Sequence, residues 1–197
     1  MGNKLVAIGD SFTVGIGDEV KGVALKSWVD HFAQQHTPAL EYTNLAKRGL
    51  KTKEIREQQL DEALDMRPNL VSIIAGANDI LKGDWNRKVF EEELKLMVDS
   101  LSKSGTTIII GNLPDFTIRI PMPPEQQQLI KGQLVEANDI IQSLSNEYNL
   151  FHINLWSHSI AEDNTFWSKD LVHPNSLGYQ QIGELFFELF SNRKTNV

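Results

Sequence analysis

The chain has 197 residues, of which 19 are Lys or Arg and 26 are Asp or Glu, so its formal net charge is −7. It contains no cysteine, which excludes thiol nucleophiles, disulfide bonds and cysteine-ligated metal centres. The acidic excess argues against a nucleic-acid partner and against an anionic membrane surface, because the average field of the chain repels both. The length predicts a single domain over residues 1–197.

No targeting segment is recognisable at the start of the sequence. The first residues lead directly into the apolar run 5–8, without the basic region, long apolar core and cleavage site of a signal peptide. No apolar run approaches the roughly 20 residues of a membrane span. We therefore expect a cytoplasmic protein with no membrane partner.

Short apolar runs alternate along the chain with longer stretches in which apolar residues recur every three or four positions. The short runs predict strands and the longer stretches predict helices. In chain order we expect strand 5–9, a helix around 25–32, a weak strand 41–44, helix 52–66 with Thr52 as its cap, strand 70–75, a helix around 90–101, strand 106–110, a helix around 130–144, strand 151–153 and a helix around 182–190.

This alternation predicts an α/β protein. Strands joined by helical crossovers form a parallel sheet that is covered on both faces, and right-handed crossovers make it a three-layer α/β/α sandwich with a five-stranded parallel sheet. Ligands bind such sheets beyond the carboxyl ends of the strands, near the point where the strand order reverses. Reactive side chains are therefore expected in the segments directly after the strands.

The segment after the first strand reads Gly9-Asp10-Ser11. A serine at a strand-to-helix turn exposes its hydroxyl and leaves its N–H available to an anion, but the same residues are also common in ordinary turns and helix caps. The nearby Gly15 and Gly17 lack the third glycine of a dinucleotide fingerprint and the Gly-Lys-Ser/Thr of a P-loop. We therefore reject a nucleotide-binding loop here.

Two further segments after strands carry candidate hydrogen-bond donors. Gly49 either provides a positive φ angle alone or brings a backbone N–H close to a ligand. Asn78, within Gly76-Ala77-Asn78-Asp79, either ties its own loop or donates a side-chain hydrogen bond to a developing oxyanion. Each residue taken alone leaves both interpretations open.

The last candidate is Asp170-Leu171-Val172-His173, just before the final predicted helix. Residues three apart in a turn point to one side, so the Asp170 carboxylate can reach the His173 ring. A carboxylate that accepts one ring N–H leaves the other ring nitrogen as a base. A histidine in this position is also common as an ordinary loop residue, and the spacing alone favours neither interpretation.

In combination these motifs resemble one known family. Gly9-Asp10-Ser11, Gly49, Gly76-x-Asn78-Asp79 and Asp170-x-x-His173-Pro174 are similar, in order and context, to the motifs of the SGNH hydrolases, also called the GDSL lipase/esterase family. The resemblance extends from residue 9 to residue 174, nearly the whole chain. One position departs from it, since Phe12 follows the serine where the family name has leucine. Another apolar residue there is not expected to disable the nucleophile.

The resemblance implies a flavodoxin-like SGNH-hydrolase fold and a serine esterase that cleaves esters of short acyl chains through an acyl-enzyme at Ser11. His173 would be the general base and then the general acid, and Asp170 would orient it. The Ser11 and Gly49 N–H groups and the Asn78 side chain would form the oxyanion hole. These are the groups that acyl transfer needs. The resemblance implies no cofactor and no metal, and it allows a homo-oligomer.

Other sites and functions are less well supported. The α/β-hydrolase elbow Gly-x-Ser-x-Gly is missing around Ser11. The remaining histidines lack the spacing of metal ligands and are expected to be structural or solvated; they are His31, His36, His152 and His158. Within the same family, a deacetylase or thioesterase remains open. A different class of function, an inactive member that binds a carbohydrate or acyl ligand, is disfavoured because every motif residue is present.

Residues 111–124 follow the fourth predicted strand and should border the site. Their apolar side chains suggest a wall or flap of an acyl pocket, although a proline-stiffened surface loop or a subunit contact fits equally well. Trp85 and Trp167 flank two of the motifs and either shape the pocket or pack in the interior.

The acidic net charge favours a neutral small-molecule ester as substrate. A local basic patch is the exception to examine, and its candidate members are Arg119, Lys47 and Arg48.

Overall fold

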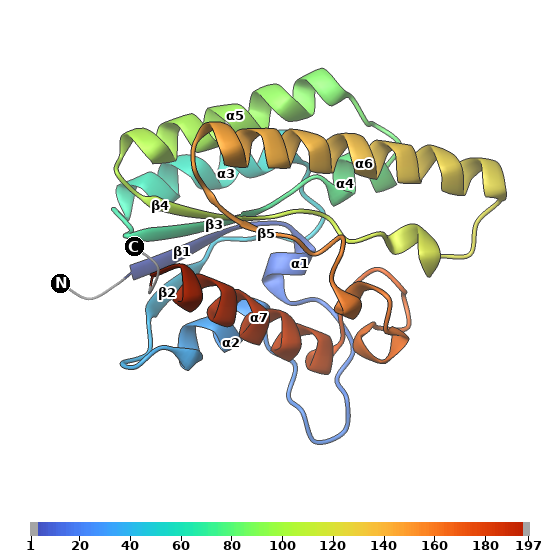
Figure 1. Cartoon of the computed structure of the whole chain (residues 1–197), viewed down its shortest axis with the longest axis horizontal. Coiled ribbons are helices and arrows are strands. Elements are labelled where there is room, and N and C mark those ends of the chain that lie inside the picture. Colours follow the sequence, from blue (N-terminus) through green and yellow to red (C-terminus); the bar gives the residue numbers. More distant parts are fainter. Residues whose placement is uncertain (1–3, 195–197) are drawn as a thin grey trace.

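In this computed structural model, which describes residues 4–194, five parallel strands form one sheet (Figure 1). The strands are β1 (Lys4–Gly9), β2 (Glu41–Asn44), β3 (Leu70–Ile74), β4 (Thr107–Gly111) and β5 (Phe151–Ile153). Their order across the sheet is β2-β1-β3-β4-β5. The predicted five-stranded parallel sheet is confirmed, and each strand end lies within one residue of its predicted position.

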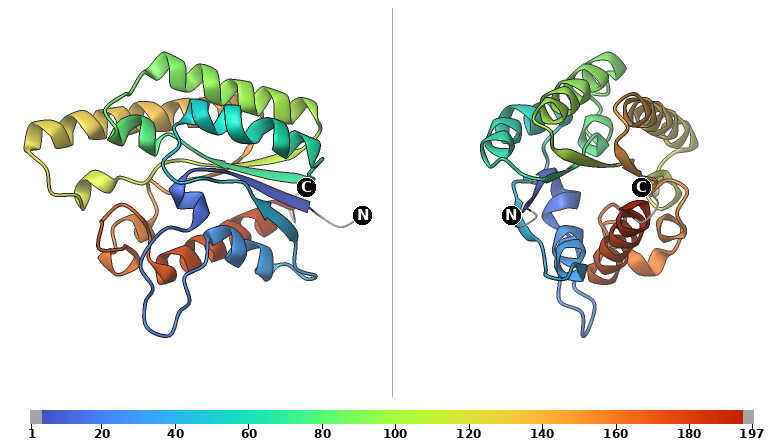
Figure 2. Two further views of the ribbon diagram at one scale, coloured as in Figure 1. Left: turned by 180° about the vertical axis from the view of Figure 1, so that it is seen from behind. Right: turned by 60° about the vertical axis from the view of Figure 1, so that its left-hand side comes forward.

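Helices cover both faces of the sheet (Figures 1 and 2). The α-helices are α1 (Ser11–Val14), α2 (Trp28–Gln35), α3 (Thr52–Asp65), α4 (Ala77–Leu81), α5 (Arg87–Lys103), α6 (Pro124–Glu147) and α7 (Ser176–Lys194). Helices α3, α4, α5 and α6 lie on one face, and α1, α2 and α7 on the other. Short 3-10 turns occur at η1 (Phe116–Ile118), η2 (Ser159–Ala161) and η3 (Asn164–Phe166). The three-layer α/β/α architecture is thereby confirmed.

Alternation along the strands explains why both faces are covered. In β1, Val6 and Ile8 enter the hydrophobic core beneath α3, α5 and α6, while Leu5 and Ala7 enter the core beneath α2 and α7. Successive side chains of a strand point to opposite faces, so a strand that is apolar throughout needs a helical layer on each side.

One predicted helix start and one predicted helix cap were wrong. Helix α2 begins at Trp28 rather than near Leu25, because Ser27 and Asp30 form a capping box there. Helix α3 has Lys51, not Thr52, as its N-cap. The Thr52 hydroxyl and backbone N–H both donate to Oδ2 of Asp79 over 3.0 Å. Its hydroxyl therefore connects two segments instead of capping its own helix.

The strand order reverses between β1 and β3, since the chain moves outward from β1 to β2 and then returns to β3 on the other side of β1. The segments after β1 and β3 therefore leave the sheet side by side, at the position where such folds bind ligands. Short helices α1 and α4, which the sequence periodicity did not predict, begin within three residues of these strand ends. Among the described residues, no helix combines the length and apolar character that a bilayer crossing requires.

Candidate active site

Ser11, His173 and Asp170 form a continuous chain of hydrogen-bond contacts. Nε2 of His173 lies 2.8 Å from Oγ of Ser11, and Nδ1 of His173 lies 2.6 Å from Oδ2 of Asp170. Oδ1 of Asp170 also accepts the backbone N–H groups of Val172 and His173. Partial burial raises the pKa of Asp170, but the hydrogen bonds from His173 and Val172 outweigh it and hold the pKa below its ordinary value. The carboxylate is thus ionised and aimed at the ring.

The position of Ser11 depends on the backbone at the end of β1. Any Cβ on Gly9 would lie 2.6 Å from Oγ1 of Thr13 and 2.7 Å from the carbonyl oxygen of Ile74, so only glycine fits. The Asp10 side chain then accepts the N–H of Phe12 and caps α1. Ser11 is consequently the first residue of a helix, with its backbone N–H directed away from the helix interior.

Gln59 in α3 also contributes to this site, although no pattern in the sequence predicts it. Its side-chain amide accepts from the Gly9 N–H over 2.8 Å and donates to the Gly9 carbonyl over 2.9 Å. Gln59 is fully buried. The two bonds fix the peptide that precedes the Asp10-Ser11 turn. No sequence pattern marks a contact between residues 50 positions apart.

Three donors were expected to form an oxyanion hole, and they differ in whether they are already hydrogen-bonded within the protein. The backbone N–H groups of Ser11 and Gly49 both border one cavity and donate to no acceptor within the described residues. Gly49 has φ +80°, a conformation that favours glycine. Both hydrogens of the Asn78 amide are already donated, to Oδ2 of Asp10 over 2.9 Å and to the Leu50 carbonyl over 3.1 Å.

Two buried carboxyl groups support these loops. Burial raises the pKa of Asp10 to about 6, although the Phe12 N–H, the charge of His173 and the Asn78 amide act in the opposite direction. Burial also raises the pKa of Asp79, against the two hydrogen bonds from Thr52. Asp79 ties the segment after β3 to the start of α3, next to Gly49.

A cavity of about 340 Å³ opens beside Ser11 and His173. Most of its wall is apolar and comes from Phe12, Ile74, Ala77, Leu81, Leu113, Pro114, Phe116 and Val172. Residues 111–124 contribute three of these, so the segment is a pocket wall at its start, while Ile118 is exposed away from the cavity. Asn138 fixes this wall, since its side chain bonds both the N–H and the carbonyl of Leu113 over 2.9 Å.

Arg119, a candidate for a basic patch at the pocket, does not line the cavity. Its side chain is buried, its guanidinium lies 3.5 Å from the centroid of the Trp167 ring, and it donates to the carbonyls of Ala161 and Leu171. The Arg119 side chain points inward because the two carbonyl groups and the Trp167 ring stabilise its positive charge. Arg48 does line the cavity, together with Lys82, and Lys47 does not.

The two tryptophans are packing residues. Trp85 packs against Phe90 and donates to Glu136. Trp167 donates its ring N–H to the Ile160 carbonyl. Neither lines the cavity beside Ser11.

The other histidines lie apart from this site. Burial lowers the pKa of His31 and of His152, and Nδ1 of His158 accepts the N–H of Ile160. His36 packs edge-on against Phe32 and Phe187. Within the described part of the chain, no three His, Asp or Glu side chains are grouped as metal ligands.

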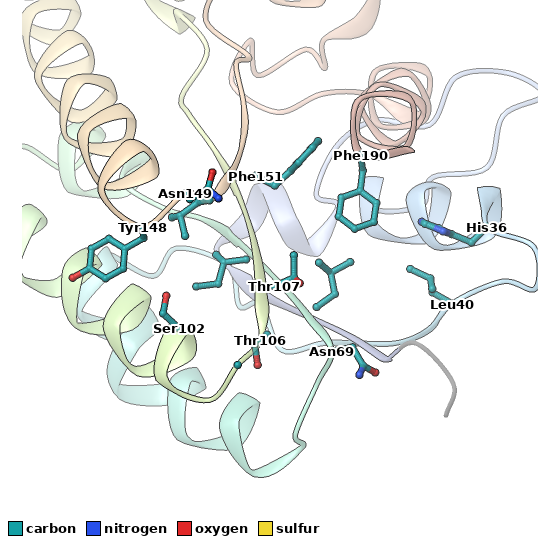
Figure 3. A pocket seen from close by; sticks show the side chains of 14 residues that line it. His36, Leu40, Asn69, Ser102, Thr106, Thr107, Tyr148, Asn149, Phe151 and Phe190 are labelled. Atoms are coloured by element: carbon teal, nitrogen blue, oxygen red, sulfur yellow. The ribbon is translucent and has the colours of Figure 1, made fainter. Parts of the chain in front are cut away.

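A second, larger cavity of about 700 Å³ lies at the opposite ends of the strands, where β3, β4 and β5 begin (Figure 3). It contains one serine and one histidine among its lining residues, Ser102 and His36. Figure 3 shows them at opposite ends of the cavity, with Thr107 and Phe190 between them. This cavity therefore contains no serine–histidine contact of the kind found at Ser11.

The chain resembles known proteins in both sequence and fold. A model of the GDSL-like lipase/acylhydrolase family matches residues 7–181. No curated protein matches the chain significantly.

Three solved structures illustrate the likeness of fold. A lipase/acylhydrolase from Enterococcus faecalis has a TM-score of 0.76 at 23% identity, with 97% of this chain and 96% of that chain covered. The psychrotrophic esterase EstA from Pseudoalteromonas sp., solved inhibited by monoethylphosphonate, has a TM-score of 0.72 at 18% identity, with 98% and 99% covered. The acetyl xylan esterase AlAXEase has a TM-score of 0.73 at 18% identity, with 94% and 98% covered.

Proposed function

This chain belongs to the GDSL-like lipase/acylhydrolase family, and from that premise we propose that it is a serine esterase that cleaves carboxylic esters of short acyl chains through an acyl-enzyme at Ser11. The observation that carries the proposal is the 2.8 Å contact between Oγ of Ser11 and Nε2 of His173, at the wall of an apolar cavity. A nucleophile within hydrogen-bond reach of a base that a third group orients is the arrangement that covalent acyl transfer requires.

In the first half of the reaction, Oγ of Ser11 attacks the ester carbonyl carbon while its proton passes to Nε2 of His173. Asp170 accepts the Nδ1–H, which fixes the ring tautomer and stabilises the imidazolium. The carbonyl oxygen becomes an oxyanion. As the tetrahedral intermediate collapses, His173 gives its proton to the leaving alcohol oxygen, and the acyl group remains bonded to Ser11.

In the second half, a water molecule loses a proton to Nε2 of His173 and attacks the acyl carbon. The C–O bond to Ser11 then breaks, the proton returns to the serine oxygen, and the carboxylic acid is released. The free backbone N–H groups of Ser11 and Gly49 stabilise the oxyanion in both halves, because preorganised donors at that position lower the barrier. Within the protein, Ser11 and His173 carry out all of these proton transfers with the substrate and the water.

Asn78 supplies the third oxyanion donor only if its amide is shared. Both of its hydrogens are engaged, with Asp10 and with Leu50. In this proposal the substrate oxygen competes with Asp10 for one of them. The exchange becomes easier when Asp10 is protonated, since a neutral carboxyl group is the weaker acceptor.

The preference for short acyl chains is supported by the size of the cavity. Its volume of about 340 Å³ lies at the lower end of the range of about 300–1,000 Å³ for small-molecule sites. The likeness to the acetyl xylan esterase makes an acetylated carbohydrate a reasonable first substrate class to test. A deacetylase of this kind uses the same chemistry at Ser11.

The proposal is tested by labelling purified protein with a fluorophosphonate probe and by assaying 4-nitrophenyl esters from acetate to decanoate. We expect labelling at Ser11, turnover that declines beyond short chains, and loss of both in Ser11→Ala with an unchanged circular dichroism spectrum. Ser176→Ala, which removes a serine distant in sequence from the nucleophile, is the control for the mass-spectrometric assignment of the label. An unlabelled, inactive wild-type protein that still binds acylated sugars would identify a binding module instead.

A further inference from the structure

Two cationic side chains line the cavity beside Ser11 and have no role in the proposed acyl transfer. Arg48 precedes the oxyanion-hole residue Gly49, and Lys82 follows α4. Lys82 donates to the Gly49 carbonyl, which leaves two of its three donor positions open. Arg48 makes no hydrogen bond or ion pair within the described residues, and all five of its N–H groups are available.

The acidic side chains of the same cavity do not neutralise this pair. Asp10 is bonded to Phe12 and Asn78 and has a pKa raised to about 6 by burial. Asp170 is bonded to His173 and to two backbone N–H groups. Arg48 and Lys82 therefore form a positively charged edge of a pocket whose two carboxyl groups are engaged with other partners, in a chain whose net charge is −7.

We propose that the preferred substrate is an ester that carries a negative charge, and that Arg48, with Lys82 beside it, binds that charge. This proposal rests on the proposed esterase function. A planar guanidinium binds carboxylate and phosphate groups in a bidentate manner, so either anion fits. The distant acidic residues oppose binding only weakly, because charges more than about 8 Å apart are largely screened at physiological salt.

The experiment uses two matched pairs of neutral and anionic esters. Phenyl acetate and 3-carboxyphenyl acetate place the charge on the alcohol part; methyl butyrate and monomethyl succinate place it on the acyl part. Hydrolysis is followed in a pH-stat with wild-type protein, Arg48→Gln and Lys82→Gln. Lys47→Gln is the control, because Lys47 is adjacent in sequence, is exposed and carries the same charge, but does not line the cavity.

In Arg48→Gln we expect kcat/KM for the anionic member of at least one pair to fall about three- to tenfold. A single partly exposed ion pair is worth about 1 kcal/mol, which corresponds to a change of this size. The neutral member should change less than twofold, and added salt should reduce the difference between wild type and variant. Lys47→Gln should leave the ratio of anionic to neutral turnover unchanged.

The proposal is overturned if neither anionic ester loses more than its neutral partner, or if Lys47→Gln has the same effect as Arg48→Gln. Failure of the esterase function itself is distinguishable, because the wild type would then hydrolyse neither member of either pair.

Arg119 contacts the turn that precedes α7. The turn that carries Asp170 and His173 contains Leu171, whose φ of +62° is unusual for a residue with a side chain. Nε of Arg119 donates to the Leu171 carbonyl over 3.4 Å, and Nη1 donates to the Ala161 carbonyl. The guanidinium stacks on Trp167, just before the turn.

No carboxylate forms an ion pair with Arg119 within the described residues, and its Nη2 atom is buried without an acceptor. Burial lowers its pKa to about 10, against the charge of Asp115. A buried guanidinium without a paired anion is costly. Its contacts join the pocket wall after β4, η2 and the Asp170–His173 turn.

We infer that Arg119 is a positioning residue for the reaction: it holds the strained Leu171 peptide, and through it the alignment of Asp170 and His173. The test compares Arg119→Met and Arg119→Lys with Arg56→Met. Arg56 is the control because it also joins two elements, through Glu93 of α5, and neither residue lines the cavity.

We expect kcat for 4-nitrophenyl acetate to fall on the order of 10- to 100-fold in Arg119→Met, as small misplacements of reacting groups cost that much, with KM within about twofold. The downfield NMR resonance of the His173 Nδ1 proton should broaden or disappear. Arg119→Lys, which keeps one donor, should retain more activity. Arg56→Met should lower stability and leave kcat and the NMR resonance intact.

A folded Arg119→Met protein with wild-type kcat and an intact Nδ1 resonance overturns the inference. If Arg119→Met does not fold, Arg119→Lys is decisive by itself: wild-type kcat and resonance overturn the inference, and reduced kcat with altered resonance supports it.

Discussion

The side-chain amide of Asn78 lies 2.9 Å from Oδ2 of Asp10 and 3.1 Å from the Leu50 carbonyl. This places the expected oxyanion donor in a bond with the carboxyl group of the residue directly before Ser11, the proposed nucleophile. The segments after β1, β2 and β3 meet in this contact. A substrate that uses the Asn78 amide must therefore displace or share a bond that already organises the resting site.

Replacing Asn78 with alanine tests that role. We expect kcat of Asn78→Ala to fall about 10²–10³-fold, the cost of losing one oxyanion donor, with a small change in KM. Steady-state kinetics with 4-nitrophenyl acetate measures the loss. Asn86→Ala is the control, since Asn86 caps α5 away from the cavity and its loss should reduce stability alone. A loss below twofold in Asn78→Ala would remove the residue from the mechanism.

Asp10 should make the stability of the protein depend on pH in an unusual direction. Its pKa rises from 3.8 to about 6 on folding because burial penalises the charged form. The folded protein therefore binds a proton more tightly than the unfolded chain. The resulting stabilisation is fully present below about pH 4 and is lost as pH rises through about 6; a shift of this size corresponds to about 3 kcal/mol.

The side chain at position 10 cannot ionise in Asp10→Asn, so this variant should not lose stability through this group as pH rises. The free energy of unfolding, measured with urea at several pH values between 4.5 and 7.5, should fall with rising pH more steeply in the wild type than in Asp10→Asn. The variant carries a constant penalty at every pH from its altered bonds to Phe12 and Asn78. Parallel pH curves for the two proteins would contradict the raised pKa.

Because Gln59 bonds the buried Gly9 peptide, we expect a substitution of Gln59 to lower the stability of the protein more than a substitution of an exposed glutamine does. Gln59→Leu removes the acceptor of the buried Gly9 N–H, which costs about 1–3 kcal/mol, whereas the Gly9 carbonyl keeps its bond from the Lys47 N–H over 3.2 Å. We expect a loss of about 1–3 kcal/mol in urea unfolding and a lower kcat in the folded protein. Gln142→Leu changes an exposed glutamine of α6 and should alter stability only slightly. Equal effects of the two substitutions would show that the Gly9 bonds are unimportant.

The features that sequence predicted are those that local pattern determines. Successive apolar side chains of residues 5–8 point to opposite faces of the sheet, so the strand requires a helical layer on each face. The junctions between strands and loops then place Ser11 and Asn78 at the carboxyl ends of the strands. The Asp170–His173 contact follows from a spacing of three residues. Each of these can be derived without knowing which distant segments meet.

The features that sequence did not predict depend on contacts between distant segments. Gln59 reaches Gly9 across 50 positions, and Arg119 reaches Leu171 across 52. Arg119 was a candidate for a basic patch at the pocket because arginine is rarely fully buried. Only the meeting of Trp167, Ala161 and Leu171 creates the buried position that it occupies. The engaged state of the Asn78 amide is likewise a property of three loops together.

The wall of the cavity predicts how acyl-chain preference can be changed. Leu81 lies at the end of α4, lines the cavity and is only partly buried, so its truncation enlarges the pocket with limited damage to the core. We expect Leu81→Ala to raise kcat/KM for 4-nitrophenyl hexanoate relative to acetate about tenfold, since the accommodation of one further methylene alone is worth about 1–3 kcal/mol. Leu129→Ala, which removes an exposed leucine of α6 that does not line the cavity, should leave the ratio unchanged. If the ratio is also unchanged in Leu81→Ala, the acyl chain lies elsewhere, and the wall formed by Leu113 and Phe116 becomes the place to substitute next.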